Sequence, residues 1–197
     1  LKTPIAAIMM SLKLLEDKRV GEMNDEQIKL AESIKESSES LLNITGELLK
    51  MTQVESGALQ LNPKIIKPIE LIDYAIGATR VLADKFKCNI EVDYPETIGK
   101  LFVDSEKIAW VVTNLLSNAI HYSQENSRII IGARQIDKKI EIYVRDFGKG
   151  IDPRYHKTIF ERYFRVPGTK VQGSGLGLAI SKEFVEAHGG TIKVESA

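Results

Sequence analysis

The sequence has one cysteine, no net charge and no long apolar run, and each of these absences excludes a class of function. Cys88 is the only cysteine, which excludes a disulfide framework and a thiolate metal cluster. The 27 basic and 27 acidic residues cancel, so no overall field draws the chain to nucleic acid or an anionic membrane. No apolar run approaches the length that spans a bilayer, about 20 residues. These absences predict a soluble, cytoplasmic segment that recognises its ligands at local sites.

The chain also lacks an initiator methionine and a signal peptide. It opens on Leu1-Lys2-Thr3-Pro4 in a helical pattern, so we expect a piece of a longer protein.

The first 57 residues have the period of a helical hairpin. Apolar residues three and four apart predict a helix over residues 5–15, and a second helix follows a polar break at 20–24. The second helix carries two heptad series, which are Ile34, Leu41 and Leu48, and, interrupted at Ser37, Leu30, Ile44 and Met51. Two helices cannot bury such a seam alone. We therefore expect residues 1–57 of two chains to form a dimeric four-helix bundle.

Beyond Gly57 the pattern changes to alternating strands and helices. We expect strands at residues 59–67, 89–94, 101–103 and 191–195, a β-hairpin of 128–135 and 139–145, and helices at 68–86, 105–122 and 176–188. Helices over one face of a mixed sheet make an α/β sandwich, so residues 58–197 are predicted to form a second domain. The predicted fold class is α+β.

Two asparagines form the first of three clusters that together suggest one nucleotide site. Asn114 and Asn118 lie one turn apart on the predicted helix 105–122. Their amide oxygens suit Mg²⁺, a hard cation that prefers oxygen ligands, and Asn118 is the predicted metal ligand. Two asparagines alone would more simply indicate a solvated polar face. This helix is apolar, however, and buried amides need partners.

The second cluster is Asp146-Phe147-Gly148-Lys149-Gly150. It follows an apolar strand, so the Asp146 carboxylate is held at a strand end and can accept a hydrogen bond from the amino group of adenine. Gly148 and Gly150 permit a tight turn there. For this motif by itself, an Asp-x-Gly turn that only closes a hairpin is the simpler alternative.

The third cluster, Gly173-Ser174-Gly175-Leu176-Gly177, precedes a predicted helix whose free N–H groups can bind phosphate. No strand runs directly into it, as a Rossmann motif requires, and the absence of Gly-Lys-Ser/Thr excludes a P-loop. The preceding segment, 151–172, carries Arg162, Arg165 and Lys170 among aromatic residues. A loop this long is usually functional, so we expect a lid whose cations neutralise a triphosphate; a solvated basic loop is the alternative.

In this order, the clusters resemble the catalytic core of a sensor histidine kinase of a two-component system. Residues 114–122 resemble the N box, 146–150 the G1 box, 159–164 the F box and 173–178 the G2 box, and Leu1-Lys2-Thr3-Pro4 resembles the end of the H box. The resemblance covers essentially the whole chain. It implies a dimeric hairpin that carries the phosphoacceptor histidine, followed by a Bergerat-type ATP-binding domain.

The resemblance also assigns roles to individual residues. It implies that Asn118 coordinates magnesium, that Asn114 positions the reacting phosphate, and that Asp146 binds adenine with Tyr122 packed near the base. It places the phosphates at the G2-box residues, which are Gly173, Gly175, Leu176, Gly177 and Leu178.

Histidine is where the chain departs from the family. The family's phosphoacceptor lies two positions before the residue that matches Leu1, and none of His121, His156 and His188 replaces it, so we expect this chain by itself not to autophosphorylate. His121 stands where the family usually has Lys or Arg facing the phosphates. An unperturbed imidazole is charged only near or below about pH 6.5, so ATP affinity should weaken as pH rises.

Thr3 matches the position that, in this family, orients a water for dephosphorylation of the partner. The alternative is a helical threonine whose hydroxyl caps the turn before Pro4. The resemblance therefore allows phosphatase activity beside kinase activity.

For the complete protein, the resemblance implies transfer of the γ-phosphoryl group of ATP to histidine and then to an Asp of a response-regulator receiver domain. It also implies a link to a membrane or sensory domain. Two other classes stay open. An Hsp90- or MutL-type ATPase would need a Glu at Asn114 to activate water. A non-catalytic dimerisation module would have a vestigial nucleotide site, against which the intact glycines, Asp146 and both asparagines argue.

Overall fold

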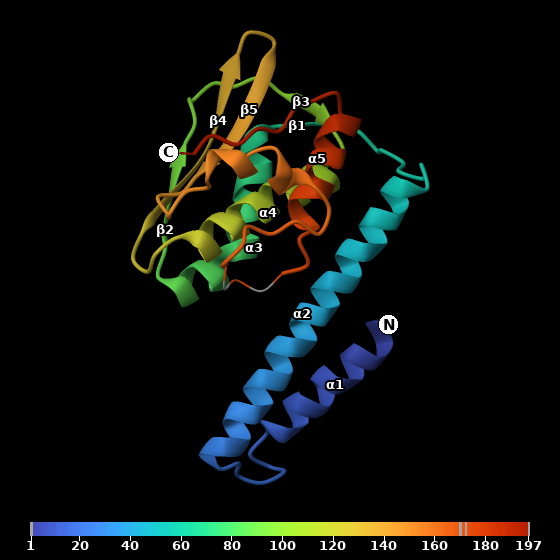
Figure 1. Cartoon of the computed structure of the whole chain (residues 1–197), viewed down its shortest axis with the longest axis vertical. Coiled ribbons are helices and arrows are strands. Elements are labelled where there is room, and N and C mark those ends of the chain that lie inside the picture. Colours follow the sequence, from blue (N-terminus) through green and yellow to red (C-terminus); the bar gives the residue numbers. More distant parts are fainter. Residues whose placement is uncertain (1, 170, 172, 197) are drawn as a thin grey trace. The chain divides into compact units, whose positions relative to one another are not determined.

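The structure is a computed structural model that describes residues 2–169, 171 and 173–196. Leu1 of the H box and Lys170 of the lid lie outside the described residues. The chain folds as two units, Leu1–Gly57, called here the hairpin unit, and Ala58–Ala197, called the sheet unit (Figure 1). Among the described residues, no helix combines the length and the apolar composition needed to cross a membrane.

The hairpin unit consists of α1 (Lys2–Leu15) and α2 (Asp25–Glu55). The polar break between them contains the start signal of α2. The Asn24 side chain accepts a hydrogen bond from the Gln27 N–H, and the Gln27 side chain accepts one from the Asn24 N–H, both at 2.9 Å. This reciprocal cap satisfies two N–H groups that the first turn of a helix leaves unpaired.

Apart from Met51, the predicted heptad residues are not the buried residues of α2. The buried residues Ala31, Ser38 and Thr45 recur every seven residues on α2, and Ile5 and Leu12 are the buried pair on α1. The predicted seam residues Ile34, Leu41 and Leu48 remain 39–49% exposed in the single chain. Between Ala31 and Thr45, the buried positions of α2 therefore carry small or hydroxyl-bearing side chains, whereas Ile34, Leu41 and Leu48 stay exposed in the single chain.

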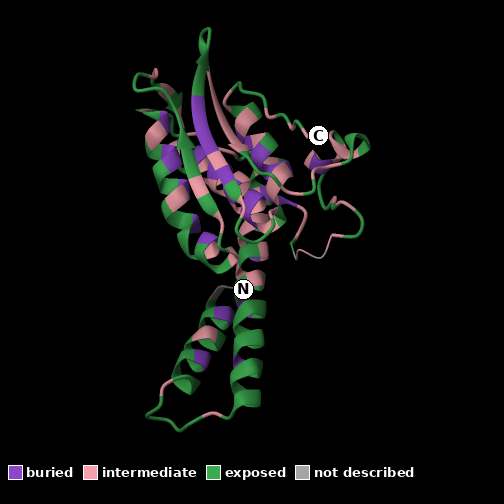
Figure 2. Cartoon of the chain, turned by 90° about the vertical axis from the view of Figure 1, so that its left-hand side faces the viewer, coloured by how far each residue is buried: buried purple, intermediate pink, exposed green. Residues whose placement is uncertain are grey.

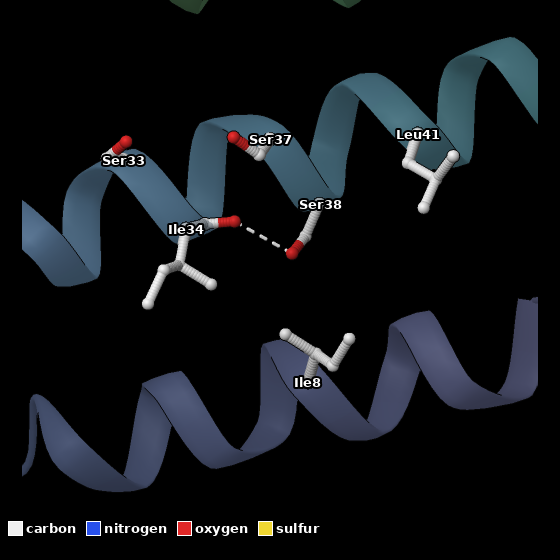
Figure 3. Close-up of a pocket in the computed structure, with 6 residues that line it drawn as sticks. All are labelled: Ile8, Ser33, Ile34, Ser37, Ser38 and Leu41. Carbon is white, nitrogen blue, oxygen red and sulfur yellow. Dashed lines mark hydrogen bonds between the residues drawn. The ribbon is translucent and has the colours of Figure 1, made fainter.

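A shallow cavity of about 240 Å³ lies beside this contact and is lined by Ile8, Ser33, Ile34, Ser37, Ser38 and Leu41. Figure 3 shows Ile8 pointing from α1 toward α2, and Ser38 on the side of α2 that faces α1. The Ser38 hydroxyl donates to the Ile34 carbonyl at 2.7 Å, so its polar atom is satisfied within its own helix. A buried serine at this position therefore leaves no hydroxyl proton unpaired.

The sheet unit contains a three-stranded mixed sheet with the order β2-β4-β5. β2 (Asn89–Asp93) pairs in parallel with β4 (Arg128–Ile136), which pairs antiparallel with β5 (Lys139–Arg145). A separate antiparallel ribbon joins β1 (Lys64–Ile66) to β3 (Leu101–Val103). The predicted α+β class with a mixed sheet is confirmed.

Helix α4 (Ser105–Tyr122) lies at the centre of the sheet unit, where it contacts α3 (Pro68–Phe86), α5 (Gly177–Ala187) and strands of the sheet. Its side chains Leu116 and Ile120 are fully buried, as are Ile131 of the sheet and Ile180 of α5. Figure 2 shows the buried residues gathered in the sheet unit and largely missing from the two hairpin helices. α4 is therefore held rigidly, which suits a helix that carries both predicted site asparagines.

One strand prediction is too long and another is wrong. The predicted strand 59–67 is reduced to Lys64–Ile66, because Pro63 has no N–H to donate and the Asn62 N–H donates instead to the Asp104 carboxylate at 3.0 Å. The predicted strand 191–195 forms no ladder in the described part of the chain. Ile192 and Val194 are half-buried between exposed neighbours, so this segment has the alternation of a strand without its hydrogen bonds.

Candidate functional site

The first and third sequence clusters meet through one buried serine. Asn114 and Asn118 lie on α4 and are both half-buried. The Asn114 Nδ2 lies 2.9 Å from the hydroxyl of Ser181 on α5, and that hydroxyl donates to the carbonyl of Gly177 at 2.9 Å. Ser181 has no exposed surface, and it belongs to none of the sequence clusters because it lies beyond the glycine run, inside α5.

Gly177 leaves room for the approach of Asn114 in its present orientation. A Cβ placed on Gly177 would lie 2.6 Å from Asn114 Oδ1, a separation at which one of the two must move. The glycine was predicted for a close approach of phosphate. In the structure it also lets the Asn114 amide lie directly over the first residue of α5.

The second cluster packs against the other end of α4. A Cβ on Gly148 would lie 2.5 Å from the Tyr122 carbonyl oxygen, so glycine is what lets this turn reach the helix end. The Asp146 Oδ1 accepts a hydrogen bond from the Gly148 N–H at 2.9 Å, and Gly150 has a φ of 71°. The simpler alternative, an Asp-x-Gly turn, is therefore present, but it uses one of two carboxylate oxygens, and Asp146 is exposed.

Phe147 anchors the same turn from the strand side. The Arg128 guanidinium lies 4.6 Å and the Arg145 guanidinium 5.0 Å from the centre of its ring. Cations at these distances are attracted to the electron-rich face of an aromatic ring. The turn that carries Asp146 is thus fixed to β4 and β5 by contacts that the motif alone did not reveal.

A cavity of about 320 Å³ lies where these segments come together, and it is lined by His121, Tyr122, Lys149, Gly168, Thr169 and Val171. These residues come from the end of α4, the second cluster and the segment before the third. The His121 Nδ1 lies 2.9 Å from the Ser117 carbonyl, which can only accept, so Nδ1 carries the proton. Edge-to-face contact with Phe86, at 5.4 Å between ring centres, also holds the His121 ring.

The predicted lid is partly folded. It contains two short 3-10 helices, Pro153–Tyr155 and Thr158–Phe160, and Ile159 is buried. The Arg162 guanidinium lies 3.8 Å from the Glu183 carboxylate on α5, and Arg165 donates to the Val171 carbonyl. In the structure Arg162 and Arg165, the two predicted phosphate cations that are described, therefore contact groups of the protein itself.

The glycine run joins the lid to α5. Gly175 has a φ of 74° and a Cβ there would lie 2.8 Å from the Tyr163 backbone, while the Tyr163 N–H donates to the Gly175 carbonyl at 3.0 Å. Gly173 is exposed and Leu178 is half-buried. Leu176 is fully buried, so its side chain belongs to the core, and its N–H donates to the Ser174 hydroxyl at 3.0 Å.

A polar junction that the sequence did not predict ties α4 to α5. The His188 Nε2 accepts a hydrogen bond from the Asp104 N–H at 2.9 Å, and its Nδ1 donates to the Phe184 carbonyl at 2.6 Å. Burial raises the pKa of the Asp104 carboxyl, but hydrogen bonds from Lys107 and Asn62 outweigh it and lower that pKa to about 2. The ionised Asp104 thus caps α4 while His188 holds the end of α5 beside it.

Thr3 is an exposed residue near the start of α1, in the hairpin unit.

The candidate ligands for a metal ion are the asparagine side chains of α4. The part of the chain that the structure describes holds no group of three or more His, Cys, Asp and Glu side chains that could bind an ion. The amide oxygens on α4 fit a hard cation that takes its remaining ligands from phosphate and water, which is the behaviour of magnesium.

Two family models match the chain. Residues 1–57 match the model described as "His Kinase A (phospho-acceptor) domain", and residues 103–197 match "Histidine kinase-, DNA gyrase B-, and HSP90-like ATPase". The second match includes both asparagines of α4 and the second and third clusters.

Relatives match over nearly the full chain. The histidine protein kinase DivJ of Caulobacter vibrioides is 30% identical over 100% of this chain, and the sensor protein KdpD of Clostridium acetobutylicum is 34% identical over 98%. The chain spans 33% and 22% of the lengths of these two proteins. The solved structure of the mycobacterial sensor histidine kinase MprB is similar with a TM-score of 0.61 and 32% identity, over 68% of this chain and 85% of that one.

Proposed function

Because this chain belongs to the sensor histidine kinases of two-component systems, we propose that its sheet unit binds Mg-ATP for phosphorylation of a histidine in the complete protein. One observation carries the proposal. The first cluster lies on α4, and the two clusters that follow it in the sequence both reach this helix: a Cβ on Gly177 would meet Asn114, a Cβ on Gly148 would meet the Tyr122 backbone, and Lys149 shares a cavity with His121.

In this proposal the second cluster and the end of α4 bind the base. The free oxygen of Asp146 accepts a hydrogen bond from the adenine amino group, Tyr122 packs near the ring, and Gly148 and Gly150 shape the turn. Recognition of adenine through one carboxylate oxygen requires that the turn be rigid, and the Phe147 contacts with Arg128 and Arg145 support this.

The phosphates lie between α4 and the start of α5 in this proposal. Asn118 holds magnesium, which when bound would neutralise phosphate charge. Backbone N–H groups along Gly173, Gly175, Leu176, Gly177 and Leu178 donate to phosphate oxygens at the positive end of α5. Arg162 and Arg165 exchange their present contacts with Glu183 and Val171 for the triphosphate, and both contacts are exposed enough to break at low cost.

The proposed reaction is an in-line transfer. An imidazole nitrogen forms a bond to the γ-phosphorus while the bond from that phosphorus to the β,γ-bridging oxygen breaks, and ADP leaves. Catalysis comes from positioning and charge neutralisation. By family resemblance the acceptor lies two positions before Leu1, and the phosphoryl group then passes to an Asp of a response-regulator receiver domain.

The hairpin unit supplies the dimer in this proposal. Its exposed residues Ile34, Leu41 and Leu48 are the seam of a four-helix bundle made with a second copy. Thr3 acts in dephosphorylation of the response regulator. The complete protein is proposed to place this core in the cytoplasm, linked to a membrane or sensory domain.

A water-activating ATPase of the Hsp90 or MutL type is not supported. Such an enzyme needs a general base at the position of Asn114, and the Asn114 amide instead donates to Ser181.

The test uses the complete protein and radiolabelled Mg-ATP. We expect acid-labile, alkali-stable phosphate on the wild type, its loss in Asn118→Ala, and its retention in Asn43→Ala, which removes an exposed asparagine from α2. Phosphate that survives in Asn118→Ala at the wild-type rate would contradict the role proposed for α4.

A further inference from the structure

Ser181 is a fully buried hydroxyl whose partners both belong to the candidate site. It lies one turn after Gly177 on α5 and faces Asn114 on α4. No sequence cluster includes Ser181, although it contacts residues of two of them.

The single hydroxyl proton of Ser181 determines the orientation of the Asn114 side-chain amide. A serine hydroxyl has one proton, and the Gly177 carbonyl at 2.9 Å can only accept, so the proton lies on that bond. Toward Asn114 the hydroxyl oxygen must then act as an acceptor. The group 2.9 Å away is accordingly the Asn114 Nδ2, which donates.

The same arrangement directs the Asn114 oxygen toward the glycine cluster. A Cβ on Gly177 would lie 2.6 Å from Oδ1 and 3.1 Å from Nδ2, so Oδ1 is the amide atom nearer to the start of α5. An amide oxygen accepts hydrogen bonds and binds cations, and it cannot donate to a phosphate oxygen. If the amide were reversed, an NH₂ group would take its place and repel a cation.

We propose that Ser181 is a positioning residue that fixes the Asn114 amide with its oxygen toward the nucleotide site. The inference rests on the proposed function and deepens it. Asn114 then assists the phosphates through the magnesium ion, whereas direct contact with phosphate would require its nitrogen. Ser181 acts only through Asn114 and touches no ligand itself. Partners that orient a ligand in this way typically change metal affinity by about 10–100-fold when they are removed.

The test compares Ser181→Ala with Thr79→Val in the 197-residue chain. Thr79 on α3 is a matched control, because its buried hydroxyl donates to the carbonyl four residues earlier, at 2.8 Å to Ala75, as Ser181 does. ATP binding is measured by calorimetry with Mg²⁺ and again with a chelator. We expect Ser181→Ala to weaken ATP binding about tenfold with Mg²⁺ and to leave it unchanged with the chelator, and Thr79→Val to change neither.

A second measurement observes the amide directly. In protein with ¹⁵N-labelled asparagine, the Asn114 side-chain NH₂ should exchange with solvent more slowly than that of exposed Asn43, and Ser181→Ala should abolish this protection. An Asn114 side chain that exchanges as fast as Asn43 in the wild type overturns the proposal, even if Ser181→Ala fails to fold. If the wild type binds no ATP, the proposed function fails. If it binds ATP and Ser181→Ala shows unchanged Mg²⁺ dependence, only this inference fails.

Discussion

The two units of the chain bury their apolar residues in opposite ways. In the sheet unit the large side chains Leu116, Ile120 and Ile131 are fully buried. In the hairpin unit the buried positions of α2 include Ala31, Ser38 and Thr45, while Ile34 and Leu41 are about half exposed. The comparison shows that the sheet unit buries large apolar side chains within the chain, whereas the hairpin unit leaves Ile34 and Leu41, which belong to the proposed dimer seam, half exposed.

The difference follows from the residues that each helix offers. A helix with a buried face on several sides, such as α4, can pack against helices and sheet at once. A two-helix hairpin has one internal contact, and small residues there bring α1 and α2 close together without consuming the heptad residues. The proposed dimer and the proposed ATP site can therefore be tested by substitutions in different units.

The largest expected effect is on the core of the sheet unit. Leu116→Ala should lower the free energy of unfolding of this unit by about 2–5 kcal/mol, because truncation of a fully buried leucine leaves a cavity. Trp110 is the only tryptophan and lies on α4, so its fluorescence during urea unfolding reports this unit alone. The control Leu41→Ala in the hairpin should leave that transition in place. Equal shifts of this urea transition in Leu116→Ala and Leu41→Ala would contradict the claim that the two units are stabilised separately.

The next effect is on dimerisation. Leu41→Asp should weaken the dimer at least about 100-fold in sedimentation equilibrium, because it would place an unpaired charge in the proposed seam. Asn43→Asp adds the same charge to an exposed site two residues away and should change dimerisation less than about threefold. A dimer that tolerates both substitutions would show that the exposed heptad face has another role.

A smaller effect, of about 2 kcal/mol, is expected at the junction between α4 and α5. The folded-state pKa of Asp104 is lowered to about 2, so its ionised form stabilises the fold above the unfolded pKa of about 3.9. Asp104→Asn should therefore be less stable than the wild type near neutral pH. In urea unfolding at a series of pH values, this gap should narrow as pH falls from about 4 to about 2. A constant gap would mean that the charge of Asp104 does not contribute.

The smallest expected effect concerns His121. His121→Lys places a permanent charge in the cavity, so at about pH 8 it should bind Mg-ATP about two- to fivefold more tightly than the wild type. Titration calorimetry of the two proteins at this pH measures the difference. Identical affinities would exclude a phosphate contact for His121.

Periodicity and cap residues predicted the helices well, since α3 and α4 have the bounds expected from the sequence. Periodicity wrongly predicted a strand at residues 191–195, because alternation shows which side chains are buried but does not supply a partner strand. The heptads of large residues mark an apolar face that the single hairpin leaves largely exposed at Ile34 and Leu41, and periodicity did not indicate that Ala31 and Ser38 would be buried instead.

For the candidate site, spacing identified the clusters but not what joins them. The contact of Asn114 with Ser181 crosses 67 residues of sequence, and that of Asp104 with His188 crosses 84, so no local pattern could reveal either one. The Gly177 and Gly148 positions could be expected to need glycine. Only the fold shows that Asn114 approaches Gly177 and that the Tyr122 backbone approaches Gly148.

Binding of Mg-ATP to the 197-residue chain by titration calorimetry tests the central claim most directly. The wild type should bind one nucleotide per chain, and Asp146→Asn should weaken binding at least about tenfold, because an amide nitrogen in place of the carboxylate oxygen cannot accept from the adenine amino group. Asp137→Asn, in the exposed turn between β4 and β5, should bind as the wild type does. Equal binding by the wild type and Asp146→Asn, or negligible binding by both, would contradict an ATP site assembled around α4.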